Sequence, residues 1–177
     1  AVFGDIDLDG DLDCYVANLA GLSALYLNNG TGTFTPVIPS GAEVSGDAYG
    51  TVFADFNNDG YPDLYAATDV NDALFVNNGD GTFTIVGTGI SNGVSSRSVQ
   101  AIDYDNDGRL DVFVSNNSAE NVLYHNNGDG TFSDVDNTLG LLSGVLGTTD
   151  NAGMGAALGD IDSDGDMDIW QVCENNQ

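Results

Sequence analysis

Four copies of one acidic loop carry most of the chemical potential of this chain. Each copy reads Asp-x-Asp/Asn-x-Asp-Gly-x-x-Asp, and the copies begin at Asp5, Asp55, Asp103 and Asp160. Carboxylates at alternate positions of a tightly curled loop converge on one point, which suits a hard cation that takes roughly six to eight oxygen ligands. Magnesium demands a strict octahedron and keeps its water, so the pattern favours calcium, with about four ions in all and one in each loop.

The expected ligands fall at equivalent positions of the loops. Positions 1, 3, 5 and 9 supply side chains, position 6 is the glycine of the sharp turn, and position 7 supplies a backbone carbonyl. The ligands are then Asp5, Asp7, Asp9, Asp11 and Asp13; Asp55, Asn57, Asp59, Tyr61 and Asp63; Asp103, Asp105, Asp107, Arg109 and Asp111; and Asp160, Asp162, Asp164, Asp166 and Asp168. Asn57 replaces a carboxylate, so the second loop should bind the cation least tightly.

The sequence around the loops disfavours an EF-hand, which has a Glu at loop position 12 and a helix on each side. Position 12 instead holds Val16, Ala66, Val114 and Gln171, each within a run typical of a strand. The loops are therefore expected to join two strands. For a single copy, a solvated Asp-Gly turn without metal is the alternative. Because clustered carboxylates repel one another without a metal, binding and folding should be coupled.

A tandem repeat with a period of about fifty residues positions the loops. A second block recurs in register with them, at Leu25–Phe34, Leu74–Phe83 and Leu123–Phe132. In each unit one strand precedes the loop and another follows it, and the second block supplies two more strands around an Asn-Asn-Gly turn. Four antiparallel strands per unit describe a blade of a β-propeller, so the chain is expected to be all-β.

The repeat divides a single domain into three full blades and a partial fourth. The expected limits are 1–48, 49–97, 98–153 and 154–177. The longest spacer, Val135 to Ala152, would be a lengthened connection between the third and fourth blades. Because repeat architectures cap or close their ends, these residues are expected to be a segment of a longer propeller or of an assembly.

Residues outside the loops are interpreted mainly as structural. One aromatic row is expected to pack between blades rather than stack on sugars, and a row of Phe residues is expected to be core. These rows are Tyr15, Tyr65, Phe113 and Trp170, and Phe34, Phe83 and Phe132. The single histidine, His125, stands where other units have Leu27 and Val76, with no recurring nucleophile as partner. No catalytic residue is therefore expected.

Two acidic turns and two cysteines complete the candidates. Asp80 and Asp129 lie in Asn-Asn-Gly-Asp-Gly turns, and hairpin chemistry explains them better than a second cation site does. Cys14 and Cys173 could form one disulfide or remain thiols, because two cysteines make no disulfide framework and no zinc spacing.

Composition limits the partners of the chain. It has 28 acidic residues against two basic ones, Arg97 and Arg109, and a formal charge of −26. Nucleic acid and anionic membranes bind clustered Lys and Arg, so neither is an expected partner. No apolar run approaches the roughly 20 residues of a membrane span. Hydrophobic residues make up 41%, enough for a folded protein, and the acidity favours an extracellular one.

The acidic loop and the second block together resemble the FG-GAP/VCBS repeat family, which includes the propeller of integrin α-subunits. The block Leu-Tyr-x-Asn-Asn-Gly-Asp-Gly-Thr-Phe is similar to that of secreted bacterial members, including those followed by an ASPIC/UnbV region. The resemblance covers nearly the whole chain. It implies propeller blades, structural calcium and an extracellular or cell-surface setting. The first block departs from the pattern, since Thr31 stands where later blocks have Asp80 and Asp129.

These features predict a non-enzymatic, calcium-stabilised extracellular module with an adhesive, structural or assembly role. Its partners would be calcium and other copies of itself, another surface protein or glycans. Two alternatives remain: a calcium-dependent, carbohydrate-binding lectin, and the non-catalytic propeller of a larger secreted hydrolase or lyase. The fold alone does not decide between them, because one fold serves many functions.

Overall fold

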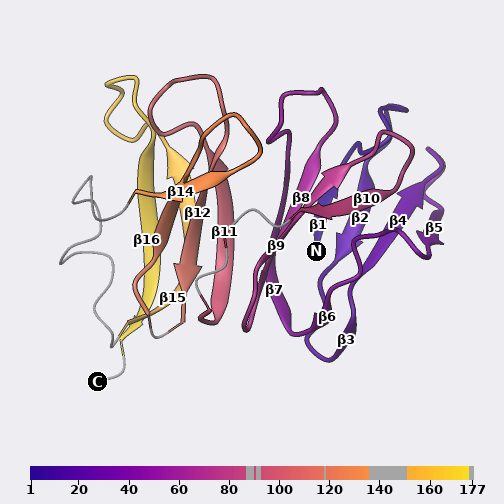
Figure 1. The fold of residues 1–177 in the computed structure, drawn as a ribbon, viewed down its shortest axis with the longest axis horizontal. Helices are drawn as coiled ribbons and strands as arrows, with labels where there is room; N and C mark the ends of the chain where they lie inside the picture. The colour runs from indigo at the N-terminus through magenta and orange to yellow at the C-terminus, as the bar shows by residue number, and fades with distance from the viewer. Residues whose placement is uncertain (87–89, 91–92, 118, 136–150, 176–177) are drawn as a thin grey trace.

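The computed structural model describes residues 1–86, 90, 93–117, 119–135 and 151–175, with the backbone alone for 151–154 and 171–175. Every regular element in these residues is a β-strand, and they contain no helix that is long and apolar enough to cross a membrane. Three four-stranded antiparallel sheets follow one another along the chain, then a two-stranded sheet, and consecutive sheets lie side by side (Figure 1). The expected all-β fold of tandem, propeller-like blades is confirmed.

Each blade uses the same order of strands. The strands are β1 (Val2–Gly4), β2 (Asp13–Val16), β4 (Ala24–Asn28) and β5 (Phe34–Val37) in blade 1; β7 (Ala48–Ala54), β8 (Asp63–Thr68), β9 (Ala73–Asn77) and β10 (Phe83–Val86) in blade 2; β11 (Ser96–Ile102), β12 (Asp111–Asn116), β13 (Val122–Asn126) and β14 (Phe132–Asp134) in blade 3; and β15 (Asn151–Gly159) and β16 (Asp168–Asn175) in blade 4. A short pair, β3 (Gly21–Leu22) and β6 (Ser45–Gly46), joins blade 1 to the connection that leads into blade 2.

The starts of the sheets lie close to the expected blade limits. β7 begins at residue 48, β11 at residue 96 and β15 at residue 151, against expected starts at 49, 98 and 154. The expected long connection between the third and fourth blades falls mainly on residues 136–150, which lie outside the described residues.

The strand register places every acidic loop in the same way. The last residue of the first strand pairs with the Asp at loop position 9, which begins the second strand. These pairs are Gly4 with Asp13, Ala54 with Asp63, Ile102 with Asp111, and Gly159 with Asp168. Each loop is therefore closed at its base by an antiparallel pair, and its ends are held at the separation of neighbouring strands.

The hydrophobic core lies between consecutive blades. Tyr15, Tyr65 and Phe113 occupy equivalent positions on the second strands, and all three are fully buried. Tyr15 packs in a cluster with Leu64 and Phe75 of the next blade, and the two later rings are buried in the corresponding clusters. The expectation that this aromatic row packs between blades is confirmed for these three residues.

Two members of the aromatic rows are not core residues, contrary to expectation. Phe34 is 41% exposed and Trp170 is 65% exposed. Phe83 and Phe132 each pack into a cluster that includes residues of the preceding blade. Phe34 is the equivalent residue of blade 1, and the described residues contain no blade before it. Trp170 likewise has no following blade within the described residues. Position within the repeat sets the side-chain direction, but burial also needs the adjacent blade.

Glycine permits a close approach of two first strands. Gly50 lies in β7, which runs beside β11. A Cβ atom on Gly50 would lie 2.8 Å from the Cα atom of Ser98 and 3.0 Å from the carbonyl oxygen of Arg97. Both are backbone atoms, so they cannot rotate away as the end of a flexible side chain could. The contact between blades 2 and 3 therefore requires a residue without a side chain at this position.

Replacing Gly50 by Ala should loosen the contact between blades 2 and 3. Overpacking of this kind costs about 1–3 kcal/mol, and we expect the free energy of unfolding to fall by that amount in urea titrations at fixed calcium. Gly21→Ala is the matched control, because a Cβ on Gly21 would have no atom within 4 Å. Equal stabilities for the two variants would contradict the steric requirement.

Candidate metal centres

The four acidic loops have the same backbone conformation. Position 4 lies in the left-handed region in every loop, with φ of 60° at Leu8, 58° at Asn58, 58° at Asn106 and 62° at Ser163. The glycine at position 6 has φ of 96°, 93°, 86° and 97° in the four loops in turn. Leu and Ser are poor residues for a positive φ, so the curl is imposed by the loop as a whole rather than by the local preference at position 4.

Carboxylates within each loop hold this curl. The Asp at position 1 accepts a hydrogen bond from the N–H of the position 6 glycine, at 3.1, 2.9, 2.9 and 3.1 Å along the chain. The Asp at position 5 accepts one from the N–H of position 7, at 2.9, 2.9, 2.9 and 3.0 Å. The side chains that could bind a cation therefore also form the turn that brings them together.

The Asp at position 9 has a structural role in addition to the metal binding that its sequence suggests. Asp13, Asp63 and Asp111 are fully buried, and one oxygen of each accepts a hydrogen bond from the N–H of loop position 2. The other oxygen accepts one from the first Asn of the Asn-Asn-Gly turn, at 2.8, 2.9 and 2.7 Å. This carboxylate thus joins its own loop to the end of the third strand, whether or not it also binds a cation.

Burial makes ionisation of these carboxyls costly. Loss of solvent raises the pKa of Asp13 and Asp111 above the ordinary range, and it raises the pKa of Asp63 to about 6. The backbone donors oppose this shift, while neighbouring loop carboxylates add to it. Since the pKa is higher in the folded state, the folded protein binds protons more readily. Without metal, stability is therefore lost as pH rises from about 4 to 6, and a bound cation would offset that loss.

Carboxylate oxygens converge in three of the loops. In each of these groups, one ligand atom from every member lies within 4.8 Å of the others. The groups are Asp5, Asp7 and Asp13; Asp103, Asp105 and Asp107; and Asp160, Asp162 and Asp168. In the first loop, Oδ1 of Asp5 is buried and receives no hydrogen bond. A buried carboxylate oxygen without a donor is costly, so these acidic groups could hold a metal ion, and their all-oxygen donor set fits a hard cation.

In the second and third loops, another side chain contacts one of the candidate ligand carboxylates. In the second, Nδ2 of Asn57 donates a hydrogen bond to Oδ2 of Asp59 at 2.9 Å, which occupies an oxygen that the cation would use. In the third, the guanidinium of Arg109 forms an ion pair with Asp107. Arg109 was expected to contribute only its carbonyl, and the ion pair could not be inferred from the loop pattern.

A histidine also joins the third loop. Nδ1 of His125 lies 3.5 Å from Oδ2 of Asp105 and 3.3 Å from Oδ1 of Asp111. The three residues form a further group whose ligand atoms lie within 4.8 Å of one another. The sequence contained a signal for this residue, since histidine replaces Leu27 and Val76 of the other blades, but it did not reveal which side chains His125 would meet.

Asparagines that tie consecutive blades together were missed from the sequence. Nδ2 of Asn77 donates to the carbonyl oxygen of Pro62 in its own blade at 3.0 Å, and to that of Ile6 in the preceding loop at 2.8 Å. Asn126 repeats this arrangement with the carbonyl oxygens of Leu110 and Phe56. The available signal was the constant first Asn of the Asn-Asn-Gly turn. The first and second loops are thereby fixed by their own blade and also by the next one.

The remaining candidates have structural explanations. Asp80 and Asp129 accept hydrogen bonds from the backbone and hydroxyl of Thr82 and Thr131, which accounts for both as turn residues. Cys14 is half-buried in β2. The side chain of Cys173 lies outside the described residues, so one disulfide and two thiols both stay open for these cysteines.

Comparison with known proteins identifies the family. The model of the FG-GAP-like repeat matches three times in succession, at residues 5–66, 55–114 and 103–170, so the chain belongs to the FG-GAP repeat family. No curated protein sequence matches it. Among solved structures, the fold is similar to that of an Agrocybe aegerita lectin described for specific recognition of non-reducing terminal N-acetylglucosamine. The TM-score is 0.61 at 20% identity, over 96% of this chain and 46% of the lectin, so the chain spans about half the length of that protein.

Removal of the inter-blade hydrogen bond should be measurable. Asn77→Ala leaves the carbonyl oxygens of Ile6 and Pro62 without their donor, and we expect a loss of about 2–4 kcal/mol in the free energy of unfolding. Asn28→Ala is the matched control. The side chain of Asn28 donates to the carbonyl oxygen of Leu12 and accepts the N–H of Gly30, as Asn77 does with Pro62 and Gly79, but both of these bonds lie within one blade. A loss for Asn28→Ala as large as that for Asn77→Ala would show that the inter-blade bond contributes nothing.

Proposed function

We propose that this chain is a non-enzymatic, extracellular repeat module in which calcium ions bound in the acidic loops stabilise propeller blades that serve in adhesion or assembly. The observation that carries the proposal is the shared curl of the four loops, with the buried and unpaired Oδ1 of Asp5 in the first. Oxygen donors at this spacing suit calcium better than magnesium. Its partners would be a surface protein, glycans or further copies of the chain.

Several features favour a structural role for the cation. Each loop is closed at its base by strand pairing, and the loops of blades 1 and 2 are also bonded by the following blade. A cation would neutralise carboxylates within a chain whose formal charge is −26. His125 lies against two carboxylates and the ring of Tyr104 rather than against a Ser or Cys nucleophile. The proposal therefore assigns no catalytic role to this propeller, including where it is part of a larger secreted enzyme.

Calcium removal tests the proposal. A ligand present at 1,000 times its Kd stabilises the folded state by about 4 kcal/mol per site. In a chain of 177 residues this corresponds to a fall in Tm of about 10 °C or more when one such site is emptied. We expect excess chelator to lower Tm by at least that much, and calorimetric titration of the stripped protein to show about one calcium per loop.

A pair of charge-matched variants sharpens this experiment. Asp5→Asn removes one negative charge and the unpaired oxygen of the first loop, and should reduce the calcium stoichiometry by one. Glu120→Gln also removes one charge, from an exposed side chain outside the loops, and should leave the stoichiometry unchanged. An unchanged Tm in protein shown to be free of metal would overturn the structural role of calcium.

A lectin is the second candidate, because of one cavity and one similar structure. A pocket of about 160 Å³ lies between the connection leading into blade 2 and the turn after β8. It is lined by Val44, Ser45, Gly46, Asp47, Thr68, Asp69, Val70 and Asn71. β8 runs from the base of its acidic loop to Thr68, so the pocket is at the opposite end of the blade. Small pockets with converging polar groups suit a sugar unit, and the similar structure is that of a lectin.

Glycan binding distinguishes the two candidates. A lectin should bind N-acetylglucosamine or another glycan on an array in the presence of calcium, and Asp47→Asn should weaken that binding at least about tenfold, as for the loss of a charged hydrogen bond. Glu120→Gln again serves as the control for charge. Silence on the array with calcium present would reject the lectin and leave the structural role.

A further inference from the structure

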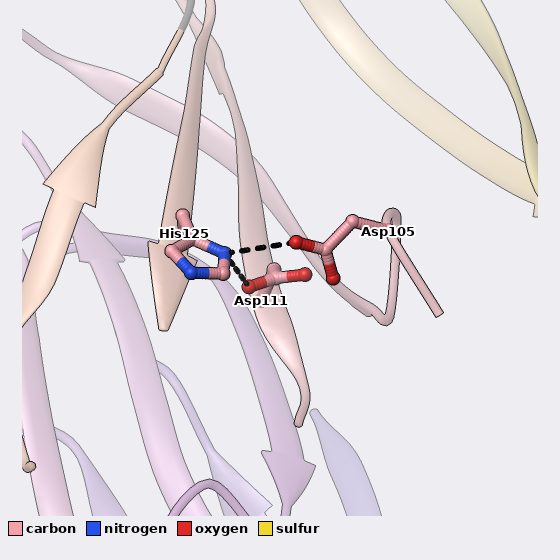
Figure 2. A group of neighbouring side chains, drawn as sticks. All are labelled: Asp105, Asp111 and His125. Carbon is pink, nitrogen blue, oxygen red and sulfur yellow. Dashed lines mark ion pairs between the residues drawn. The ribbon is translucent and has the colours of Figure 1, made fainter. Parts of the chain in front are cut away.

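The third acidic loop has an extra side chain beside it that the first two loops lack. His125 projects from β13 toward Asp111, at the base of β12, and toward Asp105 in the loop (Figure 2). The equivalent positions of blades 1 and 2 hold Leu27 and Val76, which cannot bind a metal ion. The cluster of Asp105, Asp111 and His125 is therefore specific to blade 3 within the first three blades.

The ring nitrogen that faces the carboxylates makes no hydrogen bond. Nδ1 of His125 is buried and makes no hydrogen bond within the described residues, although the side chain as a whole is 20% exposed. The ring packs edge-on against Tyr104, with centroids 5.8 Å apart and planes at 83°, which restrains its orientation. A buried imidazole nitrogen without a hydrogen bond is costly, so its position 3.3 and 3.5 Å from two carboxylate oxygens needs a reason.

The two carboxylates retain capacity for a further partner. Asp111 accepts N–H groups from Tyr104 and Asn126, one on each oxygen, which leaves about two of its roughly four acceptor positions. In the first, second and fourth loops the position 3 side chain accepts the N–H of position 5, at 3.3, 2.9 and 3.2 Å. In the third loop, Oδ2 of Asp105 instead lies toward His125.

The other side of the third loop is less suited to calcium. Arg109 pairs with Asp107, and its Nε donates to the carbonyl oxygen of Asn126 at 2.8 Å, so the guanidinium is held in place. One of the four loop carboxylates is thus matched by a positive charge within the protein. The remaining donors next to His125 form a mixed nitrogen and oxygen set, which borderline transition metals prefer and calcium does not.

We infer that Asp105, Asp111 and His125 form a binding site for a divalent transition-metal ion of the Zn²⁺ class, distinct in metal preference from the other acidic loops. Metal bonds of 2.0–2.1 Å in a tetrahedron put neighbouring ligand atoms about 3.3–3.4 Å apart. The two separations from Nδ1, 3.3 and 3.5 Å, are close to that value. Three protein ligands leave a fourth position for water or for a group of a partner molecule.

Zinc titration of the metal-stripped protein, in calcium held at millimolar concentration, tests the inference. We expect one Zn²⁺ to bind to the wild-type chain, and His125→Val to weaken that binding by about 100-fold or more, because even an outer partner of a metal ligand is worth about 10–100-fold. Valine is the residue of blade 2 at this position, so the variant should fold. A melting transition in calcium like that of the wild-type chain would confirm that it does.

Cobalt provides a readout of the ligands themselves. Co²⁺ substituted for Zn²⁺ should give the intense visible absorption of a tetrahedral site in the wild-type chain and not in His125→Val. Zinc bound by thiols or by the other loops is common to both proteins and cancels in the comparison. Equal zinc affinities in the two proteins would overturn the inference, as would a wild-type chain that binds no zinc, which would show His125 to be only an ion-pair partner of the carboxylates.

The inference and the proposed function can fail separately. The site shares Asp105 and Asp111 with the third loop, but it needs no calcium in the other loops. Calcium-dependent stability without zinc binding would remove only the inference. Zinc binding that requires His125, in a protein whose Tm does not respond to calcium, would remove only the proposed structural role of calcium.

Discussion

The buried carboxylate at the base of the first three acidic loops is the interaction on which the rest of each of those blades depends. In the first three blades it is inaccessible to solvent and accepts one N–H from its own loop and another from the third strand. An ion in such a position is stable only with close donors or a counter-charge. The donors come from the fold, and the counter-charge would come from a cation. The same residue therefore connects strand pairing, loop shape and affinity for metal.

This arrangement couples neighbouring blades as well as neighbouring strands. Asn77 and Asn126 are the last residues of β9 and β13. Each donates its backbone N–H to a buried carboxylate and its side-chain N–H to the loop of the preceding blade. A cation in the first or second loop would thus stabilise a backbone segment that two blades share. The aromatic row completes the contact from the core side, where Tyr15, Tyr65 and Phe113 are fully buried between blades. Repeat proteins gain their stability from such interfaces between neighbouring units.

One backbone serves loops of different chemistry. The first loop has only carboxylates and an unpaired buried oxygen, the second carries an amide that bonds to a carboxylate, and the third has a guanidinium on one side and an imidazole on the other. The repeated pattern predicts four equivalent sites with one weaker member at Asn57. The contacts add a departure in the third loop, where Arg109 and His125 both lie beside ligand carboxylates. The loop pattern assigns only a backbone carbonyl to the position of Arg109, so it does not predict the ion pair of its side chain. It does not predict the contact of His125 either, because His125 is on another strand.

The sequence by itself determined the all-β class, the blade repeat and the position of every acidic loop, because strand alternation, turn residues and ligand spacing are local features that recur with the period of the repeat. The tertiary structure alone decided which equivalent residues are buried, as the exposed Phe34 and Trp170 show. It also decided which side chains from other strands and blades meet each loop. Those contacts depend on how separate segments pack in space, and the strength of a buried charge depends on that packing rather than on the order of residues.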